Sequence, residues 1–259
     1  MPEALELSGS IQSIERAAAI LRLLSGRSRR LGVVEMAGQL GLPKGTVHGI
    51  LRTLQSVGFV EQHQESGKYQ LGAALLHIGS SYLDANELRT RALNWADSLA
   101  TQSGESVRIG TPHDRQVLIV HHVFRPDDSR QALEVGSLVP MHATALGKAL
   151  LAHHRYLLSD LERPLTRFTP ATVTEMDRLE RELDEIRARG WASEVGELYQ
   201  GVAAVAAPIE DRRGLIAGAI SVSGPVERLC EDTVPRAKLV GYVMETARTV
   251  SRELGAIPW

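Results

Sequence analysis

The chain has 259 residues, of which 43% are hydrophobic and 23% charged, and its formal net charge is −2 at pH 7. Length and apolar content together allow a substantial core, so we expect a folded chain, and a single cysteine, Cys230, excludes an intramolecular disulfide. No apolar run approaches the roughly 20 residues of a membrane span, and the first residues lack a signal-peptide pattern, so we expect a cytoplasmic protein without a membrane partner.

Charge is distributed unevenly along the chain. Between residues 9 and 72, eight Lys or Arg stand against four acids, which gives +4 and leaves −6 for the rest of the total of −2. A small basic unit ahead of a larger acidic one suggests a division of labour, in which the basic unit favours nucleic acid. Four charges are a modest bias, and chance is the alternative.

Three short amphipathic helices are predicted in the N-terminal unit. Ser13 is placed to cap the first, Gly41 to end the second, and Pro43 to occupy the first turn of the third. The short break between the second and third helices is typical of a helix-turn-helix. The apolar positions with helical spacing are Ile14, Ala17, Ala18, Leu21 and Leu24; Val33, Met36, Ala37 and Leu40; and Val47, Ile50, Leu51 and Leu54.

A β-hairpin is predicted after Gly58, where FVEQHQESGKYQLG contains two short extended runs joined by a turn at Gly67. Three helices and a hairpin make a winged helix. Two further apolar stripes predict a linker helix and the first helix of a second domain. A stripe that faces away from its own domain would form a dimer contact. The stripes are Leu71, Leu75, Ile78 and Tyr82, and Leu88, Ala92, Trp95 and Leu99.

The remaining chain mixes strands and helices without regular βαβ alternation. This order favours an antiparallel sheet with helices on its faces, so the predicted fold class is α+β. The predicted strands are 106–110, 117–124, 201–209 and 215–223, and the predicted helices are 143–153, 174–189 and 235–254. We divide the chain into a winged helix-turn-helix DNA-binding domain (9–72), a linker helix (73–86) and a C-terminal domain (87–259).

The third predicted helix, within GLPKGTVHGILRTLQ, carries two glycines on one face, although glycine costs about 1 kcal/mol against alanine in a helix interior. If its apolar residues face the core, the glycines face outward beside basic residues. Such a face can approach base edges closely in the major groove, while cationic side chains meet phosphate or guanine. An ordinary exposed helix with incidental glycines is the alternative. The candidate DNA contacts are Lys44, Gly45, Thr46, His48, Gly49 and Arg52, with Lys68 in the hairpin.

Several segments, in consistent order, resemble the IclR family of bacterial transcriptional regulators. These segments are IQSIERAAAILRLLSG, LGLPKGTVHGILRTLQSVGFVEQ, GKYQLG, LVPMHATALGKALLA, GVAAVAAPI and AISVSGPVERL. The resemblance implies a winged helix, a linker helix and a GAF-like effector-binding domain, in a homodimer or homotetramer that binds double-stranded operator DNA without a cofactor. Within the family, VHGILRTLQ and VLIVHHVFRPDDSRQALEVG are most similar to the glycerol-operon regulators of actinomycetes.

The recognition helix departs from the family pattern at both glycines. The family more usually has serine at the position of Gly45 and arginine at the position of Gly49. Base readout therefore cannot be copied from other members, and the operator should differ accordingly.

Effector contacts are implied by the same resemblance. Motif by motif they fall on Ala145, Leu146, Glu194, Ala204, Ser221 and Ser223. Strand alternation also places the two serines on one face with small residues, a pattern that fits either a cavity for a polar ligand or a tightly packed sheet.

The effector itself is expected to be rich in hydroxyl groups. Family members that recognise small oxo-acids typically have aspartate and cysteine at the positions of Glu194 and Ala204, so glycerol or glycerol 3-phosphate fits this chain better. A phosphate would need a cationic partner, for which Arg108, Arg125 and Arg130 are candidates.

Signals of catalysis and metal binding are weak. Walker A, G-x-G-x-x-G, G-x-S-x-G and H-E-x-x-H motifs are absent from the sequence, and the acids that follow Cys230 would raise its thiol pKa, so we expect neither an enzyme nor a metal site. Adjacent histidines diverge on a strand or a helix, so neither His121-His122 nor His153-His154 can chelate directly; a site assembled with His142 is the alternative.

These patterns predict a DNA-binding repressor of a carbon-source catabolic operon, with glycerol as the expected carbon source. One alternative is a regulator of the same family that responds to a small organic acid or an aromatic effector. The other is a metabolic enzyme with an accessory DNA-binding domain.

Overall fold

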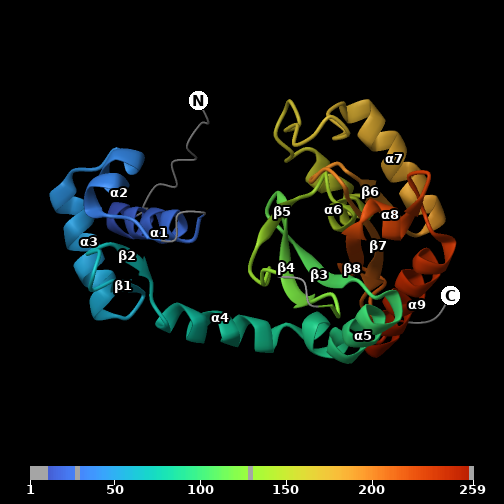
Figure 1. Ribbon diagram of the computed structural model, residues 1–259, viewed down its shortest axis with the longest axis horizontal. Coiled ribbons are helices and arrows are strands. Elements are labelled where there is room, and N and C mark those ends of the chain that lie inside the picture. Colours follow the sequence, from blue (N-terminus) through green and yellow to red (C-terminus); the bar gives the residue numbers. More distant parts are fainter. Residues whose placement is uncertain (1–10, 27–29, 128–130, 257–259) are drawn as a thin grey trace. The chain divides into compact units, whose positions relative to one another are not determined.

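The computed structural model describes residues 11–26, 30–127 and 131–256 and divides into two compact units, Met1–Ala85 and Asn86–Trp259 (Figure 1). The first unit is built from helices and one antiparallel hairpin. Its elements are α1 Gln12–Leu24, α2 Val33–Leu40, α3 Lys44–Ser56, β1 Val60–Gln62, β2 Tyr69–Leu71 and α4 Ala74–Ala85. This order is the winged helix that the sequence predicts.

Glycines in the left-handed conformation make the turns of this unit. Gly41 ends α2 with φ of 64° and donates its N–H to the Ala37 carbonyl, and Gly67 turns the hairpin with φ of 66°. Both positions need glycine because other residues rarely adopt positive φ. The expected cap at Ser13 is wrong: the N-cap residue is Ile11, two residues earlier, and the first turn of α1 receives no side-chain cap.

One apolar cluster joins the three helices to the hairpin. Its fully buried members include Ile20, Met36, Val47, Leu51 and Val60. In contrast, α4 has no buried residue. Because its apolar side chains have no core of their own, the linker stripe is available to another surface.

The second unit is built on one six-stranded sheet in which every neighbouring pair is antiparallel. The strand order is β5-β4-β3-β8-β7-β6. The strands are β3 Ser106–His113, β4 Gln116–Val123, β5 Leu138–Pro140, β6 Ala192–Val195, β7 Val202–Glu210 and β8 Ile216–Pro225.

Helices cover both faces of this sheet. Two long helices, α5 Glu87–Ser103 and α9 Ala237–Glu253, pack on one face, and α6 Ala145–Leu151 packs on the other, with α7 Met176–Arg189 against it (Figure 1). The predicted α+β class is therefore confirmed. Short elements complete the unit: a 3₁₀ helix Arg155–Leu158, α8 Val226–Leu229, β9 Cys230–Glu231 and β10 Val234–Pro235.

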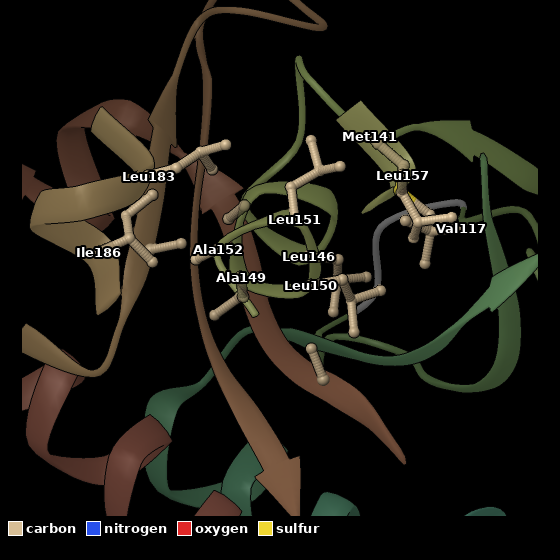
Figure 2. Close-up of a cluster of buried hydrophobic side chains, with 14 of the residues drawn as sticks. Val117, Met141, Leu146, Ala149, Leu150, Leu151, Ala152, Leu157, Leu183 and Ile186 are labelled. Carbon is tan, nitrogen blue, oxygen red and sulfur yellow. The ribbon is translucent and has the colours of Figure 1, made fainter. Parts of the chain in front are cut away.

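The core on the α6 side is formed by small and branched apolar residues. Figure 2 shows α6 between Leu183 and Ile186 of α7 on one side and Val117 of β4 on the other. These residues are fully buried, as is Ala149 of α6 itself. This packing holds the start of α6 over the sheet face that carries the predicted effector residues.

Several predicted boundaries and faces differ from the structure. The strands β5 and β6 were not predicted, because runs of three and four residues are too short to show alternation. On α5, Leu88, Ala92 and Leu99 of the predicted stripe are buried, but Trp95 is 38% exposed and the neighbouring Ala96 is fully buried. Among the described residues, no helix has the length and hydropathy needed to cross a bilayer.

Candidate nucleic-acid interface and effector site

The exposed face of α3 carries most of the candidate DNA contacts. The apolar residues Val47, Leu51 and Leu54 are buried, which turns the opposite face to solvent. Thr46 is half-buried on the flank. The exposed members of the candidate set on α3 are Lys44, Gly45, His48, Gly49 and Arg52.

The two glycines of α3 are not required by the fold. A β-carbon built on Gly45 or Gly49 meets no described atom within 4 Å beyond its own helix backbone. At Gly72, by contrast, a β-carbon would lie 2.2 Å from the Gly58 carbonyl oxygen. Packing within the described residues therefore leaves both the DNA-contact interpretation and that of incidental glycines open at positions 45 and 49.

The hairpin brings further polar groups beside α2. The Lys68 ammonium lies 3.0 Å from the Glu35 carboxylate, which also accepts the Gly32 N–H at the start of α2. These two hydrogen bonds lower the pKa of Glu35, the bond from Gly32 being the larger cause. Lys68 is thus paired within the domain, a contact that sequence spacing did not predict.

Arg30 is an exposed cation outside the set of predicted DNA contacts. Its Nε donates to the Gln70 side chain at 2.9 Å, and the neighbouring Leu31 pairs with Tyr69 as a third extended segment of the hairpin. From sequence, Arg30 stands out only as one of the basic residues of the N-terminal unit. Nothing local indicates that the next residue, Leu31, pairs with a strand residue 38 positions later.

The predicted effector residues lie on or over one face of the second unit's sheet. Strand register aligns Glu194 with Ala204 and Ala204 with Ser223 in one row across three strands. Ser221 belongs to the adjacent row, where it aligns with Arg108, and Arg108 aligns with His122. Because cross-strand partners share a face, the two serines and Glu194 project to the same side of the sheet.

The start of α6 lies over this face. The Thr144 side chain caps the helix by accepting the Gly147 N–H at 3.1 Å and donates to the Pro140 carbonyl at 2.7 Å. Ala145 and Leu146 follow directly, and both are buried. The structure thus brings all six predicted residues to one layer of the domain.

A cavity of about 280 Å³ opens at this face, but of the six predicted residues only Ser223 lines it. Ala145, Leu146, Glu194, Ala204 and Ser221 lie under packed side chains. The remaining lining is more polar than the small-residue surface predicted around the two serines. It includes Ser106, Arg108, His122, Arg125, Gln131 and Glu134.

Arg108 is the centre of a polar network in this cavity. Its guanidinium binds the Glu134 carboxylate through two hydrogen bonds, Nε to Oε2 at 2.5 Å and Nη2 to Oε1 at 2.9 Å, and its Nη1 donates to the Ser223 hydroxyl. Arg125 forms ion pairs with Glu105 and Asp127. Arg130, the third cation considered, lies outside the described residues.

His122 connects the network to the sheet. The Glu134 N–H donates to Nδ1 over 3.3 Å, so the ring proton lies on Nε2, which donates to the Ser106 hydroxyl at 2.8 Å. Burial and then the Arg108 charge lower the pKa of His122, which keeps the ring neutral near pH 7. Neither Glu134 nor His122 was predicted from sequence.

A buried charged cluster lies beside the predicted site. Lys148 of α6 is fully buried, and its ammonium lies 2.6 Å from both Glu182 of α7 and Glu197. Glu194 accepts the Glu197 N–H at 3.0 Å, and burial raises the pKa of Glu194 to about 7. A carboxyl with this pKa can donate as well as accept a hydrogen bond at neutral pH.

The other residues singled out from sequence have ordinary structural environments. His121 and His122 face opposite sides of the sheet, since Arg89 and Asp97 of α5 influence His121 whereas Arg108 and Glu134 surround His122. Within the described part of the chain, no group of three or more His, Cys, Asp or Glu is arranged to hold a metal ion.

Cys230 is buried rather than reactive. Its thiol pKa is raised, as expected, but the first cause is burial and not the acids that follow it in sequence. His153 and His154 lie in the turn after α6, not on the helix, and the His154 ring bonds the Ile216 carbonyl.

Family models match both units of the chain. The IclR helix-turn-helix domain matches residues 13–64, and the bacterial transcriptional regulator IclR C-terminal domain matches residues 80–252. The chain is 57% identical to the glycerol operon regulatory protein of Streptomyces coelicolor over 251 residues, 96% of this chain and 99% of that protein. It is 30% identical to the HTH-type transcriptional regulator XynR of Escherichia coli over 250 residues, 95% of this chain and 98% of that protein.

A solved structure has the same architecture. The IclR transcriptional regulator from Alicyclobacillus acidocaldarius superposes with a TM-score of 0.81 at 28% identity, covering 95% of this chain and all of that chain. A winged helix combined with this α+β domain defines a DNA-binding transcriptional regulator. The chain belongs to the IclR family, as the sequence resemblance indicated, and both relatives named above are regulatory proteins by name.

Proposed function

We propose that this protein controls a glycerol catabolic operon as a repressor whose DNA binding is modulated by a small-molecule effector. The observation that carries the proposal is the exposed face of α3, where Lys44 and Arg52 flank two glycines that internal packing does not require. The identity of 57% to the Streptomyces coelicolor glycerol operon regulatory protein, along nearly all of both chains, supports the choice of operon.

The proposed readout follows from the chemistry of this face. Lys44 and Thr46, near the start of α3, meet backbone phosphates, while His48 and Arg52 reach base edges or phosphates one turn further on. Gly45 and Gly49 let the helix backbone approach the floor of the major groove. Lys68 of the hairpin contacts a phosphate group, which replaces Glu35 as its ion-pair partner.

A substitution of Gly49 separates this function from stability. Gly49→Ala should stabilise the domain by up to about 1 kcal/mol, because glycine is a poor helix former. The same variant should weaken binding to the protein's own upstream DNA, since the added methyl group stands on the contact face. Footprinting and thermal melting measure the two effects on one preparation.

Gly241→Ala is the matched control for this test. Gly241 is also a helical glycine whose β-carbon would meet nothing described within 4 Å, but it lies on α9 in the other unit. It should gain similar stability without any change in the footprint. A Gly49→Ala protein that protects the DNA as well as the wild type would contradict the proposed interface.

We propose a homodimer or homotetramer for the assembled regulator, with the chain divided into DNA-binding (9–72), linker (73–86) and effector-binding (87–259) parts. The support is α4, whose apolar Leu76, Ile78 and Tyr82 are more than half exposed. A two-fold assembly reads related half-sites, so the footprint should contain an inverted repeat. A single unrepeated site bound by a monomer in sedimentation would contradict this assembly.

The proposed effector is glycerol or glycerol 3-phosphate, with Ser221, Ser223 and Glu194 recognising its hydroxyl groups. Of the predicted effector residues, Ser223 lines the cavity, whereas Ala145, Leu146 and Ala204 are buried in the core between α6 and the sheet. Binding must favour one conformational state over another, because a ligand with equal affinity for both would shift nothing. By linkage, operator DNA should weaken effector binding by the factor with which effector weakens operator binding.

Calorimetry on the full chain tests the effector assignment. The double variant Ser221→Ala, Ser223→Ala should lose polyol binding, while Ser98→Ala, an exposed serine of α5, should bind like the wild type. Equal affinity of the double variant and the wild type would place the effector elsewhere.

A further inference from the structure

The guanidinium of Arg108 joins two parts of the effector domain that are distant in sequence. One edge is occupied by the Glu134 carboxylate, at 2.5 and 2.9 Å, and Nη1 donates to Ser223 on the sheet. Glu134 belongs to the segment ahead of β5, whereas Ser223 is one of the residues already assigned to the effector site. A single side chain therefore connects the cavity to a loop.

The two members of the ion pair are not equally exposed. The Arg108 side chain is 21% exposed, and the Glu134 side chain is 35% exposed. Leaving a partly buried charge without a partner is costly, so Arg108 needs an anion at all times, whereas Glu134 is closer to water and can be rehydrated. The carboxylate is the member of the pair that another anion can replace.

The cavity beside the pair suits an anion that also bears hydroxyl groups. A guanidinium binds phosphate with the same two-pronged geometry that it uses for a carboxylate. Ser106 and Ser223 supply hydroxyls, and Gln131 supplies an amide. His122 is neutral and donates from Nε2 to Ser106, which leaves the hydrogen of the Ser106 hydroxyl able to donate into the cavity.

We propose that Arg108 is the receptor for the anionic group of a phosphate monoester, and that Glu134 is an internal counter-ion which the ligand replaces. The proposal rests on the proposed function, in that this domain binds a small-molecule effector, and it specifies the charged end of that effector. Arg108 stays paired throughout the exchange, because the phosphate arrives where the carboxylate leaves.

The exchange would also transmit a signal along the chain. The Glu134 carbonyl accepts the Ser137 N–H at 2.8 Å, directly before β5, and the carbonyl of Pro140 at the end of β5 accepts from the cap of α6. Displacing the Glu134 side chain therefore acts on the segment that leads to α6. A ligand that contacts Arg108 differently in two states of this segment meets the condition for shifting their populations.

Calorimetry on the full-length protein tests the exchange with three probes: glycerol 3-phosphate, inorganic phosphate and glycerol. Glu134→Gln keeps the shape of the side chain but removes the competing charge, so it should tighten glycerol 3-phosphate binding by about tenfold and leave glycerol unchanged. Arg108→Gln should weaken both phosphate probes by at least about tenfold. Asp184→Asn, which removes the acid of the exposed Arg155–Asp184 pair, is the matched control and should change nothing.

Each outcome decides the proposal. Phosphate probes that bind only the Glu134→Gln protein would support it, because the internal counter-ion then masks the site in the wild type. A Glu134→Gln protein that binds glycerol 3-phosphate no more tightly than the wild type, or binds none of the probes, would overturn it. Because Arg108→Gln could fail to fold, Glu134→Gln decides alone in that case. Footprinting without ligand tests DNA binding by itself. A failure of the proposed exchange at Arg108 can therefore be distinguished from a failure of the proposed function.

Discussion

The helices α3 and α6 make an instructive pair, because each carries glycine and lysine side by side. In α6, a β-carbon on Gly147 would lie 2.2 Å from the Met141 carbonyl oxygen, and Lys148 is fully buried between two carboxylates. In α3, Lys44 and Gly45 face solvent, and the glycine meets nothing. The same residue types serve the domain's own packing in one helix and remain available for an external partner in the other.

The largest effect in this comparison is expected at the buried lysine. Lys148→Met removes the cation between Glu182 and Glu197 and should destabilise the effector domain by about 3–5 kcal/mol, because the carboxylates lose their partner. Urea unfolding followed by tryptophan fluorescence measures this loss. The exposed Lys238→Met on α9 is the control and should cost under about 0.5 kcal/mol. Similar midpoints for the two variants would show that the buried cluster contributes little.

Substitution of Gly147 in α6 should be nearly as destabilising as substitution of Lys148. Gly147→Ala forces a methyl group onto the Met141 backbone, which cannot move like a flexible side chain, so we expect a loss of about 3 kcal/mol. The same measurement on Gly45→Ala should show unchanged or higher stability. A small loss of stability in Gly147→Ala would mean that the backbone around Met141 relaxes. It would contradict the proposed difference between the glycines of α6 and α3.

Glu194 should make stability depend on pH. Its pKa is about 7 when folded and near 4.5 when unfolded, so the folded state binds more protons between these values. The stability associated with this proton is complete below about pH 4.5 and is lost as pH rises through 7, a change of roughly 3 kcal/mol.

Unfolding at pH 5 and pH 8 measures this dependence. Glu194→Gln should reduce the loss of stability between the two values, whereas the exposed Glu185→Gln on α7 should retain it. An unchanged loss in Glu194→Gln would assign the pH dependence to other groups.

The smallest effect on folding is expected on α3. Arg52→Ala should change the free energy of unfolding by less than about 0.5 kcal/mol, because the side chain is exposed. Its effect should fall on DNA binding, where loss of one phosphate contact lowers the salt dependence of log K by about one. Titrations of operator DNA at several salt concentrations measure this slope. An unchanged slope with unchanged affinity would remove Arg52 from the interface.

Most of the winged helix could be predicted from sequence because its determinants are local. Apolar spacing identified Val47, Leu51 and Leu54 as buried, and Gly41 and Gly67 occupy the positive-φ turns expected of them. The first helix cap was predicted wrongly, because a serine close to a helix start fits the sequence pattern of a cap even when the helix begins before it. The Lys68–Glu35 pair was missed because it joins the hairpin to α2 across 33 residues.

The effector site could be predicted only in part. Alternation along one strand placed Ser221 and Ser223 on a common face, since side-chain direction in a strand follows from sequence position alone. The cavity beside Ser223 is completed by Arg108 and Glu134, which pair with each other across 26 residues. Arg108 was considered only as one of three possible cations, and nothing in its neighbourhood distinguished it from Arg125.

The sequence alone determined the winged helix, the longer strands and helices of the second unit, and the α+β class. Helical and strand periodicities and turn glycines act over a few residues, and they leave a readable pattern. Only the tertiary structure decided which charges are buried together: Lys148 meets Glu182 and Glu197 from 34 and 49 positions away. Burial and pairing depend on which segments the fold brings into contact, and that information is distributed over the whole chain.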